Sequence, residues 1–357
     1  MRYRLLGRSG LRVSELCLGA MVFGDTRGSW GATREDAREI LSRFTEAGGN
    51  FIDTASNYAR GASEEIVGEL VAPDRDRWVL ATKYTCSSRP EDPNAGGNHK
   101  KSLVQSLETS LRRLKVDYVD VLWVHIWDAL TPIEEVVRAL DDVVRAGKAL
   151  YVGVSDTPAW VVAKAVTLAE VRGWSPFVAL QVPYSLIERS VERELLPMAR
   201  GLDLAVTAWS PLGDGLLSGR YGSDRAQPSD SRIAGVAAHR LSERNLRIAD
   251  AVNTVAKDRG VSSAQVAIAW ITAQQYRAEI IPIVGVRTPA QLADNLGALE
   301  IELTADELAH LDTVSAIELG FPHGFGGFQL AYGSTLALID NHRPQFEVPL
   351  SRDHQRI

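Results

Sequence analysis

Short apolar runs alternate along the chain with longer stretches whose apolar residues recur at helical spacing. The short runs predict strands at 15–19, 50–53, 78–83, 118–125, 150–154, 178–182, 203–208 and 280–284. The longer stretches predict helices at 33–47, 63–70, 99–114, 132–146, 158–171 and 191–199, across 241–273, and at 289–297. Because the strands are apolar throughout, both of their faces are expected to be covered, as in a parallel sheet. Eight successive strand–helix units therefore predict an α/β protein with a single (β/α)8 TIM barrel.

Three segments lie outside this repeat. Residues 1–14 hold two short apolar runs around a glycine-containing turn, which predicts an N-terminal hairpin that closes one end of the barrel. Residues 213–240 contain a long loop rich in small residues. Residues 320–357 form a C-terminal extension with aromatic residues among glycines, which suits a mobile lid, an extension docked on the barrel wall, or a subunit contact. No break in composition divides the chain, so residues 1–357 are expected to form one domain.

Composition and charge narrow the range of partners. Of the 357 residues, 45% are hydrophobic and 24% are charged, which is typical of a globular protein with a large core. A net charge of −6 without a long basic run argues against nucleic acid, and no apolar run approaches the length of a membrane span. Cys17 and Cys86 are too few for a disulfide framework and lack the spacing of a zinc site. A cytoplasmic location is expected, and a homo-oligomer is compatible with the sequence.

Polar side chains gather where the predicted strands end. Asp53 ends the second strand, Lys83 the third and His125 the fourth, and Tyr58 follows Asp53 by five residues. Any one of them has an ordinary structural explanation, since a loop aspartate often caps a turn and a lone histidine often packs in a core. In a barrel of this kind, however, the carboxyl ends of the strands meet at one rim, where catalytic residues collect. An acid, a phenol, an ammonium and an imidazole at one rim are harder to explain by packing.

The motifs around these residues resemble the aldo-keto reductase family over nearly the whole chain. The most specific block is Asp-Thr-Ala-x-x-Tyr-x-x-Gly-x-Ser-Glu at 53–64. Weaker blocks follow in family order at 19–21, 82–83, 124–125, 153–155, 181–184, 209–212 and 285–287, with Gln291 and Asn295. The resemblance implies a barrel that binds NADPH or NADP+ across its mouth and reduces an aldehyde or ketone, a small-molecule carbonyl substrate. Within the family, the chain looks closer to bacterial and potassium-channel β-subunit-like members than to aldose reductase.

The family's catalytic residues correspond to Tyr58, Asp53, Lys83 and His125 without substitution. In this scheme Tyr58 protonates the carbonyl oxygen, and His125 hydrogen-bonds that oxygen and directs it. A phenol has an ordinary pKa of about 10, and a neighbouring ammonium such as Lys83 is expected to lower it by roughly 1–3 units. Asp53 would keep Lys83 charged.

The resemblance also implies a set of cofactor contacts. Ser155 and Gln181 match residues that hold the nicotinamide carboxamide, but the family's asparagine is replaced by Asp156, which suits a helix cap equally well. Tyr184 is expected to stack on the nicotinamide ring, although it suits a core position too. Arg287 is expected at the 2′-phosphate, because a guanidinium matches phosphate oxygens, and the loop 213–240 is expected to cover the cofactor. The remaining expected contacts are Gly19, Ala20, Met21, Asp53, Trp209, Ser210, Pro211, Leu212, Gly213, Gly215, Arg220, Arg232, Gly285, Gln291 and Asn295.

The substrate wall and the class of activity are less constrained by the sequence. Phe23, Trp30, Tyr84 and Trp127 are candidates for an aromatic substrate pocket. A cofactor-binding regulatory module with little turnover is an alternative, as is a lyase or isomerase that uses Lys83 as a Schiff-base amine. A metal enzyme is the least favoured reading, because no spacing of His, Asp or Glu suggests ligands.

Overall fold

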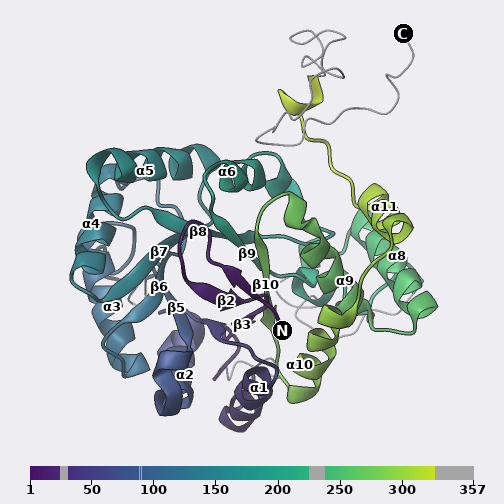
Figure 1. Cartoon of the computed structure of the whole chain (residues 1–357), viewed down its shortest axis with the longest axis horizontal. Coiled ribbons are helices and arrows are strands. Elements are labelled where there is room, and N and C mark those ends of the chain that lie inside the picture. Colours follow the sequence, from purple (N-terminus) through teal and green to yellow (C-terminus); the bar gives the residue numbers. More distant parts are fainter. Residues whose placement is uncertain (25–30, 88, 90, 225–237, 326–357) are drawn as a thin grey trace.

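A computed structural model describes residues 1–24, 31–87, 89, 91–224 and 238–325. Its centre is a closed barrel of eight parallel strands (Figure 1), in the order β10-β3-β4-β5-β6-β7-β8-β9. The strands are β3 (Cys17–Gly19), β4 (Phe51–Asp53), β5 (Val79–Tyr84), β6 (Val119–Val124), β7 (Ala149–Ser155), β8 (Phe177–Pro183), β9 (Ala205–Trp209) and β10 (Ile280–Gly285). The barrel closes where Val284 of β10 pairs with Leu18 of β3. All eight strands and the barrel expected from the apolar runs are confirmed.

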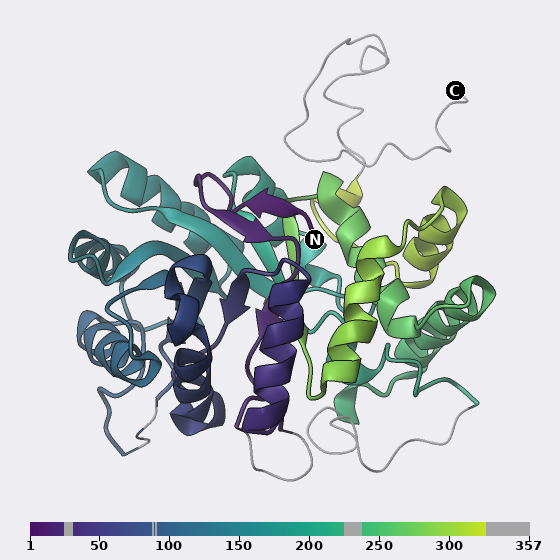
Figure 2. The same cartoon turned by 60° about the horizontal axis from the view of Figure 1, so that its bottom comes forward.

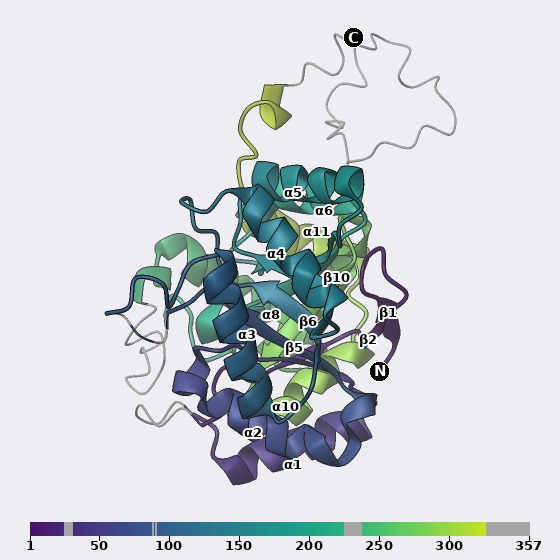
Figure 3. The same ribbon diagram turned by 90° about the vertical axis from the view of Figure 1, so that its left-hand side faces the viewer.

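Helices cover the outside of the barrel, and α1 to α5 follow one another around one side of it (Figure 3). They are α1 (Arg34–Glu46), α2 (Ala62–Val71), α3 (Lys100–Leu114), α4 (Ile133–Arg145), α5 (Ala159–Arg172), α6 (Leu195–Gly201), α8 (Glu243–Arg259), α9 (Ser263–Thr272), α10 (Pro289–Leu296) and α11 (Ala305–Val314). The helix α11 was not expected from the apolar pattern. Thr304 and Glu307 form a capping box at its start, which is a signal that the sequence does carry.

The N-terminal hairpin is also confirmed. Strands β1 (Tyr3–Leu5) and β2 (Arg12–Ser14) pair antiparallel and lie across one end of the barrel (Figure 2). Leu6 and Val13 are fully buried there, in the cluster that fills the barrel interior with Phe51 and Trp123. Because the hairpin closes this end with apolar side chains, the opposite end is left for a binding site.

One glycine inside the barrel shows how tightly the interior is filled. A Cβ at Gly153 would lie 2.3 Å from Cζ3 of Trp123, whose ring is completely buried on the neighbouring strand. A side chain at position 153 would therefore displace the indole. This contact lies two residues before Ser155 and supports the strand that carries it.

Two predicted segments are only partly described. In the loop predicted at 213–240, the residues Gly213–Gly215 form a 3-10 turn and Ala238–Arg240 form another, while 225–237 lie outside the described residues. The C-terminal extension is described only to residue 325, so its three expected roles also fall outside. Among the described residues, no helix is long and apolar enough to cross a membrane.

Candidate active site

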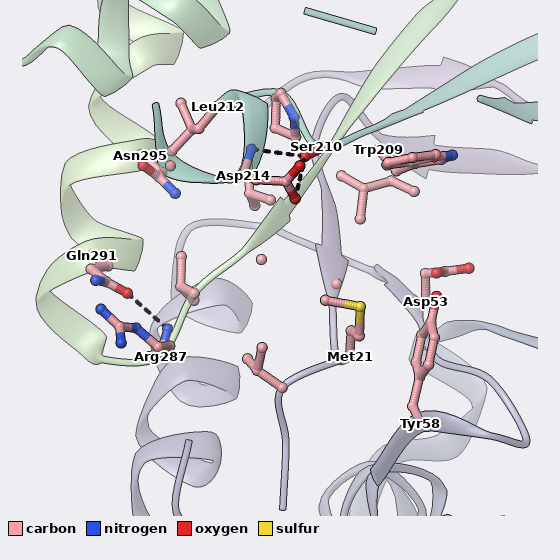
Figure 4. Close-up of a pocket in the computed structure, with 18 of the residues that line it drawn as sticks. Met21, Asp53, Tyr58, Trp209, Ser210, Leu212, Asp214, Arg287, Gln291 and Asn295 are labelled. Atoms are coloured by element: carbon pink, nitrogen blue, oxygen red, sulfur yellow. Dashed lines mark hydrogen bonds between the residues drawn. The ribbon is translucent and has the colours of Figure 1, made fainter. Parts of the chain in front are cut away.

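A cavity of about 660 Å³ opens at the carboxyl ends of the barrel strands. Figure 4 shows that Tyr58 and Asp53 lie at one side of this cavity and Arg287, Gln291 and Asn295 at the other. Eighteen of the residues predicted from the sequence line it, namely Gly19, Met21, Asp53, Tyr58, His125, Ser155, Asp156, Gln181, Trp209, Ser210, Pro211, Leu212, Gly215, Arg220, Gly285, Arg287, Gln291 and Asn295. They come from seven of the eight strand ends and from α10, so the closed barrel is what brings them together.

Lys83 is completely buried beneath the cavity, near the end of β5. Its ammonium donates to the Asp53 carboxylate, to the carbonyl oxygen of Thr54 at 2.9 Å, and to the phenol oxygen of Tyr58 at 3.1 Å. Burial by itself would lower the pKa of Lys83, but the adjacent Asp53 carboxylate and Tyr58 oxygen outweigh it and raise the pKa well above its usual value. The lysine is therefore a buried ammonium whose three protons all have acceptors.

Tyr58 begins a short turn that holds its phenol over this ammonium. The two residues after it, Ala59 (φ 46°) and Arg60 (φ 55°), both adopt left-handed backbone conformations without being glycine. Such strain persists where the surroundings hold it in place, and it is common at functional sites. Burial raises the pKa of Tyr58, and Lys83 opposes this increase. Lys83 does lower the pKa of Tyr58, as expected, but by less than burial raises it. The phenol is therefore protonated at neutral pH.

A buried ion pair supports the segment that carries Tyr58. Glu64 of α2 is completely buried and pairs with Arg113 of α3 at 3.1 Å. The same guanidinium donates to the carbonyl oxygen of Ser56 at 2.9 Å. On the other side, the hydroxyl of Thr82 donates to the Glu64 carboxylate at 2.7 Å. The pair thus connects the turn before Tyr58 to the strand residue that precedes Lys83.

His125 follows β6 and lies beside Tyr58, with the two rings edge to face and their centroids 5.7 Å apart. Burial, with the nearby Lys83 ammonium, lowers the pKa of His125 to about 3, so the imidazole is neutral. Its Nδ1 lies 3.5 Å from Sγ of Cys86. Cys86 lines the cavity, although the sequence pattern assigned it no role.

The ends of β7, β8 and β9 form the wall next to these residues. The side-chain amide of Gln181 donates to Asp53 at 3.2 Å. The indole N–H of Trp209 donates to the Asp156 carboxylate at 3.2 Å. Burial raises the pKa of Asp156, and the Trp209 hydrogen bond opposes the increase. Asp156 thus serves as a partner of the indole, and its own backbone is left-handed (φ 43°).

The opposite side of the cavity is built by the end of β10 and the start of α10. The backbone N–H of Arg287 donates to the Gln291 side chain at 2.8 Å (Figure 4). Thr288 caps α10 by accepting from the backbone N–H of Gln291. One turn further along the helix, Asn295 is buried and also lines the cavity. Arginine and amide groups therefore converge there from a single strand–helix junction.

Several expected site residues point elsewhere. Tyr184 is completely buried between the barrel and the helices, where its hydroxyl donates to Glu192 at 2.7 Å and its ring contacts Trp270. The prediction that it stacks on a nicotinamide is therefore wrong, and the indole of Trp209 is the ring that lines this wall. Ala20 and Gly213 are likewise buried outside the cavity lining.

Two of the four aromatic residues predicted for the substrate wall lie in the core instead. Phe23 and Tyr84 are completely buried, and the Tyr84 hydroxyl donates to the carbonyl oxygen of Asn98 at 3.3 Å. Trp127 packs edge to face on Trp160, with centroids 6.3 Å apart, and does not line the cavity. Trp30 and Arg232 lie outside the described residues. The cavity is also lined by residues to which the sequence pattern assigned no site role, namely Val22, Asn57, Cys86, Ile126, Asp214, Ser218, Tyr221, Ala264, Ile283, Val284, Val286 and Asp294. Most of them adjoin a predicted site residue in the sequence.

The fold is an eight-stranded α/β barrel with its cavity at the carboxyl ends of the strands, and comparison with known proteins identifies its family. The family model of the Aldo/keto reductase family matches residues 15–316, and the chain belongs to that family. A norsolorinic acid reductase of Emericella nidulans is 40% identical over 89% of this chain and 82% of its own length. An aryl-alcohol dehydrogenase of Pestalotiopsis microspora is 39% identical over 92% of this chain and 85% of its own length. A putative aryl-alcohol dehydrogenase of Saccharomyces cerevisiae is 36% identical over 91% of this chain and 90% of its own length.

These relatives correct one expectation. They are fungal proteins named as reductases and dehydrogenases, so they give no support to a place among bacterial or channel-subunit-like members. They support an oxidoreductase that acts on a small molecule by carbonyl reduction.

Proposed function

We propose that the protein reduces an aromatic aldehyde or ketone to the alcohol with NADPH, and that Tyr58 supplies the proton. The observation that carries this proposal is the hydrogen bond of 3.1 Å from the buried Lys83 ammonium to the phenol oxygen of Tyr58, at the wall of the cavity. Since the ammonium donates, the hydrogen of the phenol itself remains for an acceptor in the cavity. A carbonyl oxygen that gains negative charge during reduction is such an acceptor.

Tyr58 is suited to the role of general acid. It stays protonated at neutral pH because burial raises its pKa. As its proton leaves, negative charge develops on the phenol oxygen next to the Lys83 ammonium, which stabilises that charge directly. Asp53 keeps the ammonium in place and charged through their buried ion pair. The neutral ring of His125, edge on to Tyr58, orients the same carbonyl oxygen by a hydrogen bond.

The lining of the cavity supports the proposal of an extended dinucleotide cofactor. The two sides of the cavity carry different chemistry, with the proton donor at one and Arg287, Gln291 and Asn295 at the other (Figure 4). We assign Ser155, Gln181 and Asp156 to the nicotinamide end, with Trp209 as the aromatic ring beside it. Ser210, Leu212, Gly215 and Arg220 are assigned to the pyrophosphate, and Arg287 to the 2′-phosphate that distinguishes NADPH from NADH. The bound reduced nicotinamide supplies the hydride.

The aromatic substrate class rests on two observations. The relatives named above include a norsolorinic acid reductase and aryl-alcohol dehydrogenases. In this chain, the apolar side chains of Met21, Val22 and Ile126 and the Trp209 indole line the same cavity as Tyr58. Flat rings bury well against aromatic and apolar walls, whereas small aliphatic aldehydes would leave that surface uncovered.

The test is a comparison of substrates with purified protein. NADPH consumption is followed with benzaldehyde-type aldehydes, aryl ketones and short aliphatic aldehydes, each also with NADH. We expect turnover with the aromatic compounds and NADPH. If the aliphatic aldehydes gave the higher kcat/KM, the substrate class would be wrong. If NADPH bound but no carbonyl was reduced, the regulatory module with little turnover would be the better account.

A further inference from the structure

Two residues of the turn after β5 contact His125. The hydroxyl of Thr85 accepts from the backbone N–H of His125 at 3.3 Å, and the thiol of the next residue, Cys86, lies 3.5 Å from the ring Nδ1. Asn98 is buried behind them, accepts from the Thr85 hydroxyl at 2.7 Å and donates to the carbonyl oxygen of Ile126 at 3.1 Å. The backbone on both sides of His125 and the ring itself are therefore tied to one segment.

The backbone of this turn is unusual. Thr85 is a β-branched residue, yet its φ is 93°, a region in which side chains of this type are rarely found. The conformation is held by Asn98 and by the hydrogen bond of 2.8 Å from the N–H of Gly97 to the carbonyl oxygen of Thr85. Strained residues that persist in this way are concentrated at functional sites. Here the strained residue directly precedes the cysteine that contacts His125.

The chemistry of the contact depends on where the imidazole carries its proton. The ring is neutral because burial and Lys83 lower the pKa of His125, so only one of its nitrogens bears hydrogen. Burial raises the pKa of Cys86, so its sulfur keeps its hydrogen at neutral pH. Two arrangements of the contact follow: the thiol donates to Nδ1 and the ring proton is on Nε2, or Nδ1–H donates to sulfur and Nε2 carries a lone pair.

We propose that Cys86 is a positioning residue whose thiol donates to Nδ1 of His125 and thereby keeps the imidazole proton on Nε2, facing the cavity. This inference rests on the proposed function, because an oxygen that gains negative charge needs a donor. In the other arrangement, Nε2 would present a lone pair to the carbonyl oxygen and repel it. The thiol donates without adding a charge beside Lys83. An ionised carboxylate at this position would add a charge and would accept from Nδ1–H, which favours the opposite tautomer.

The direct test is the tautomer of His125 in the wild-type protein. We would label the chain with 15N-histidine and record long-range 1H–15N spectra at pH 7 with and without NADP+, assigning the His125 signals among the seven histidines from their loss in His125→Asn. The expected result is a protonated Nε2 and an unprotonated Nδ1. A protonated Nδ1 would overturn the proposal. Since this measurement involves no turnover, a protein with the expected tautomer that reduced no carbonyl would contradict the proposed function and leave this assignment standing.

Variants test the consequence for the reaction. Cys86→Ala removes the donor and Cys86→Ser keeps one, while Ser87→Ala alters the exposed neighbour in the same turn as a matched control. We expect kcat to fall about five- to tenfold in Cys86→Ala, as for the loss of one hydrogen bond, with the Kd for NADPH unchanged. Cys86→Ser should remain within about twofold of wild type, as should Ser87→Ala. An unchanged kcat in Cys86→Ala, or an equal loss in Cys86→Ser, would reject the donor role.

Discussion

Lys83 donates to the phenol oxygen of Tyr58 at 3.1 Å while the same ammonium is paired with the buried Asp53 carboxylate. The relationship is directional, since the lysine has only protons to give and the phenol oxygen receives one of them. It leaves the hydroxyl hydrogen of Tyr58 available to the cavity and places a positive charge where phenolate would form. The proposed chemistry depends on this arrangement.

The first prediction concerns the acid itself. Tyr58→Phe is expected to lower kcat for carbonyl reduction by at least about two orders of magnitude, because the proton donor is lost. The Kd for NADPH, measured by the quenching of protein fluorescence, should stay near the wild-type value. Tyr118→Phe is the matched control, since Tyr118 precedes β6 at the other end of the barrel and makes a cation–π contact with Arg75. Near-normal turnover in Tyr58→Phe would remove this residue from the mechanism.

The second prediction is the pH dependence of the two directions. In the proposed mechanism, reduction needs the phenol of Tyr58 and alcohol oxidation needs its phenolate. Because burial raises the pKa of Tyr58 above its usual value of 10.0, the rate of reduction should be level from pH 6 to 9 and fall only above pH 10. Alcohol oxidation should instead increase over the alkaline range. A reduction rate that fell with an apparent pKa near 7 would contradict the assignment.

The third prediction concerns stability in acid. The pKa of His125 is lowered to about 3 in the fold from an ordinary value of 6.5, so below pH 6.5 the unfolded chain binds a proton that the folded chain does not. The free energy of unfolding should therefore decrease as the pH falls through this range, by up to about 1.4 kcal/mol per pH unit from this group. Urea titrations of wild type and His125→Asn at pH 7.0, 6.0 and 5.0 measure it. The variant should show the shallower decrease, and equal slopes would mean that His125 is not neutral in the fold.

The fourth prediction separates the two nicotinamide cofactors. Arg287→Leu should raise the KM for NADPH by about 10- to 100-fold, the range for losing hydrogen bonds to a charged phosphate. The KM for NADH should change little, so NADH is the control within the same variant. An equal increase for both cofactors would show that Arg287 acts on a part that they share.

The fifth prediction addresses the ion pair beneath the Tyr58 turn. Arg113→Met leaves the completely buried carboxylate of Glu64 without its cation and should destabilise the fold by about 3 kcal/mol. Adding Glu64→Gln to Arg113→Met should restore much of the lost stability, because the buried side chain then carries no unpaired charge. Chemical denaturation of the two variants and of the double variant measures the coupling. If the single and double variants were equally unstable, the pair would not be what holds this segment.

The sequence alone predicted the repeated strand–helix units of the barrel and the site residues that belong to contiguous motifs. The eight apolar runs predicted eight barrel strands because a strand covered on both faces has no polar side. Asp53, Tyr58, Lys83 and His125 could be placed at one rim because each stands at or just after a strand end, and the ends of parallel strands meet. Helix α11 was missed although its capping box is visible, because its apolar periodicity alone did not mark it.

Tertiary structure decided which side chains at the rim face the cavity. Tyr184 and Trp209 end neighbouring strands and are both aromatic, but Tyr184 turns outward to Glu192 and Trp270, while Trp209 reaches Asp156 and lines the cavity. Tertiary structure also decided the direction of the pKa shift of Tyr58, because the increase caused by burial outweighs the decrease caused by Lys83. The order of residues determines which groups reach the end of each strand, but their orientation and desolvation depend on neighbours that only the closed barrel brings together.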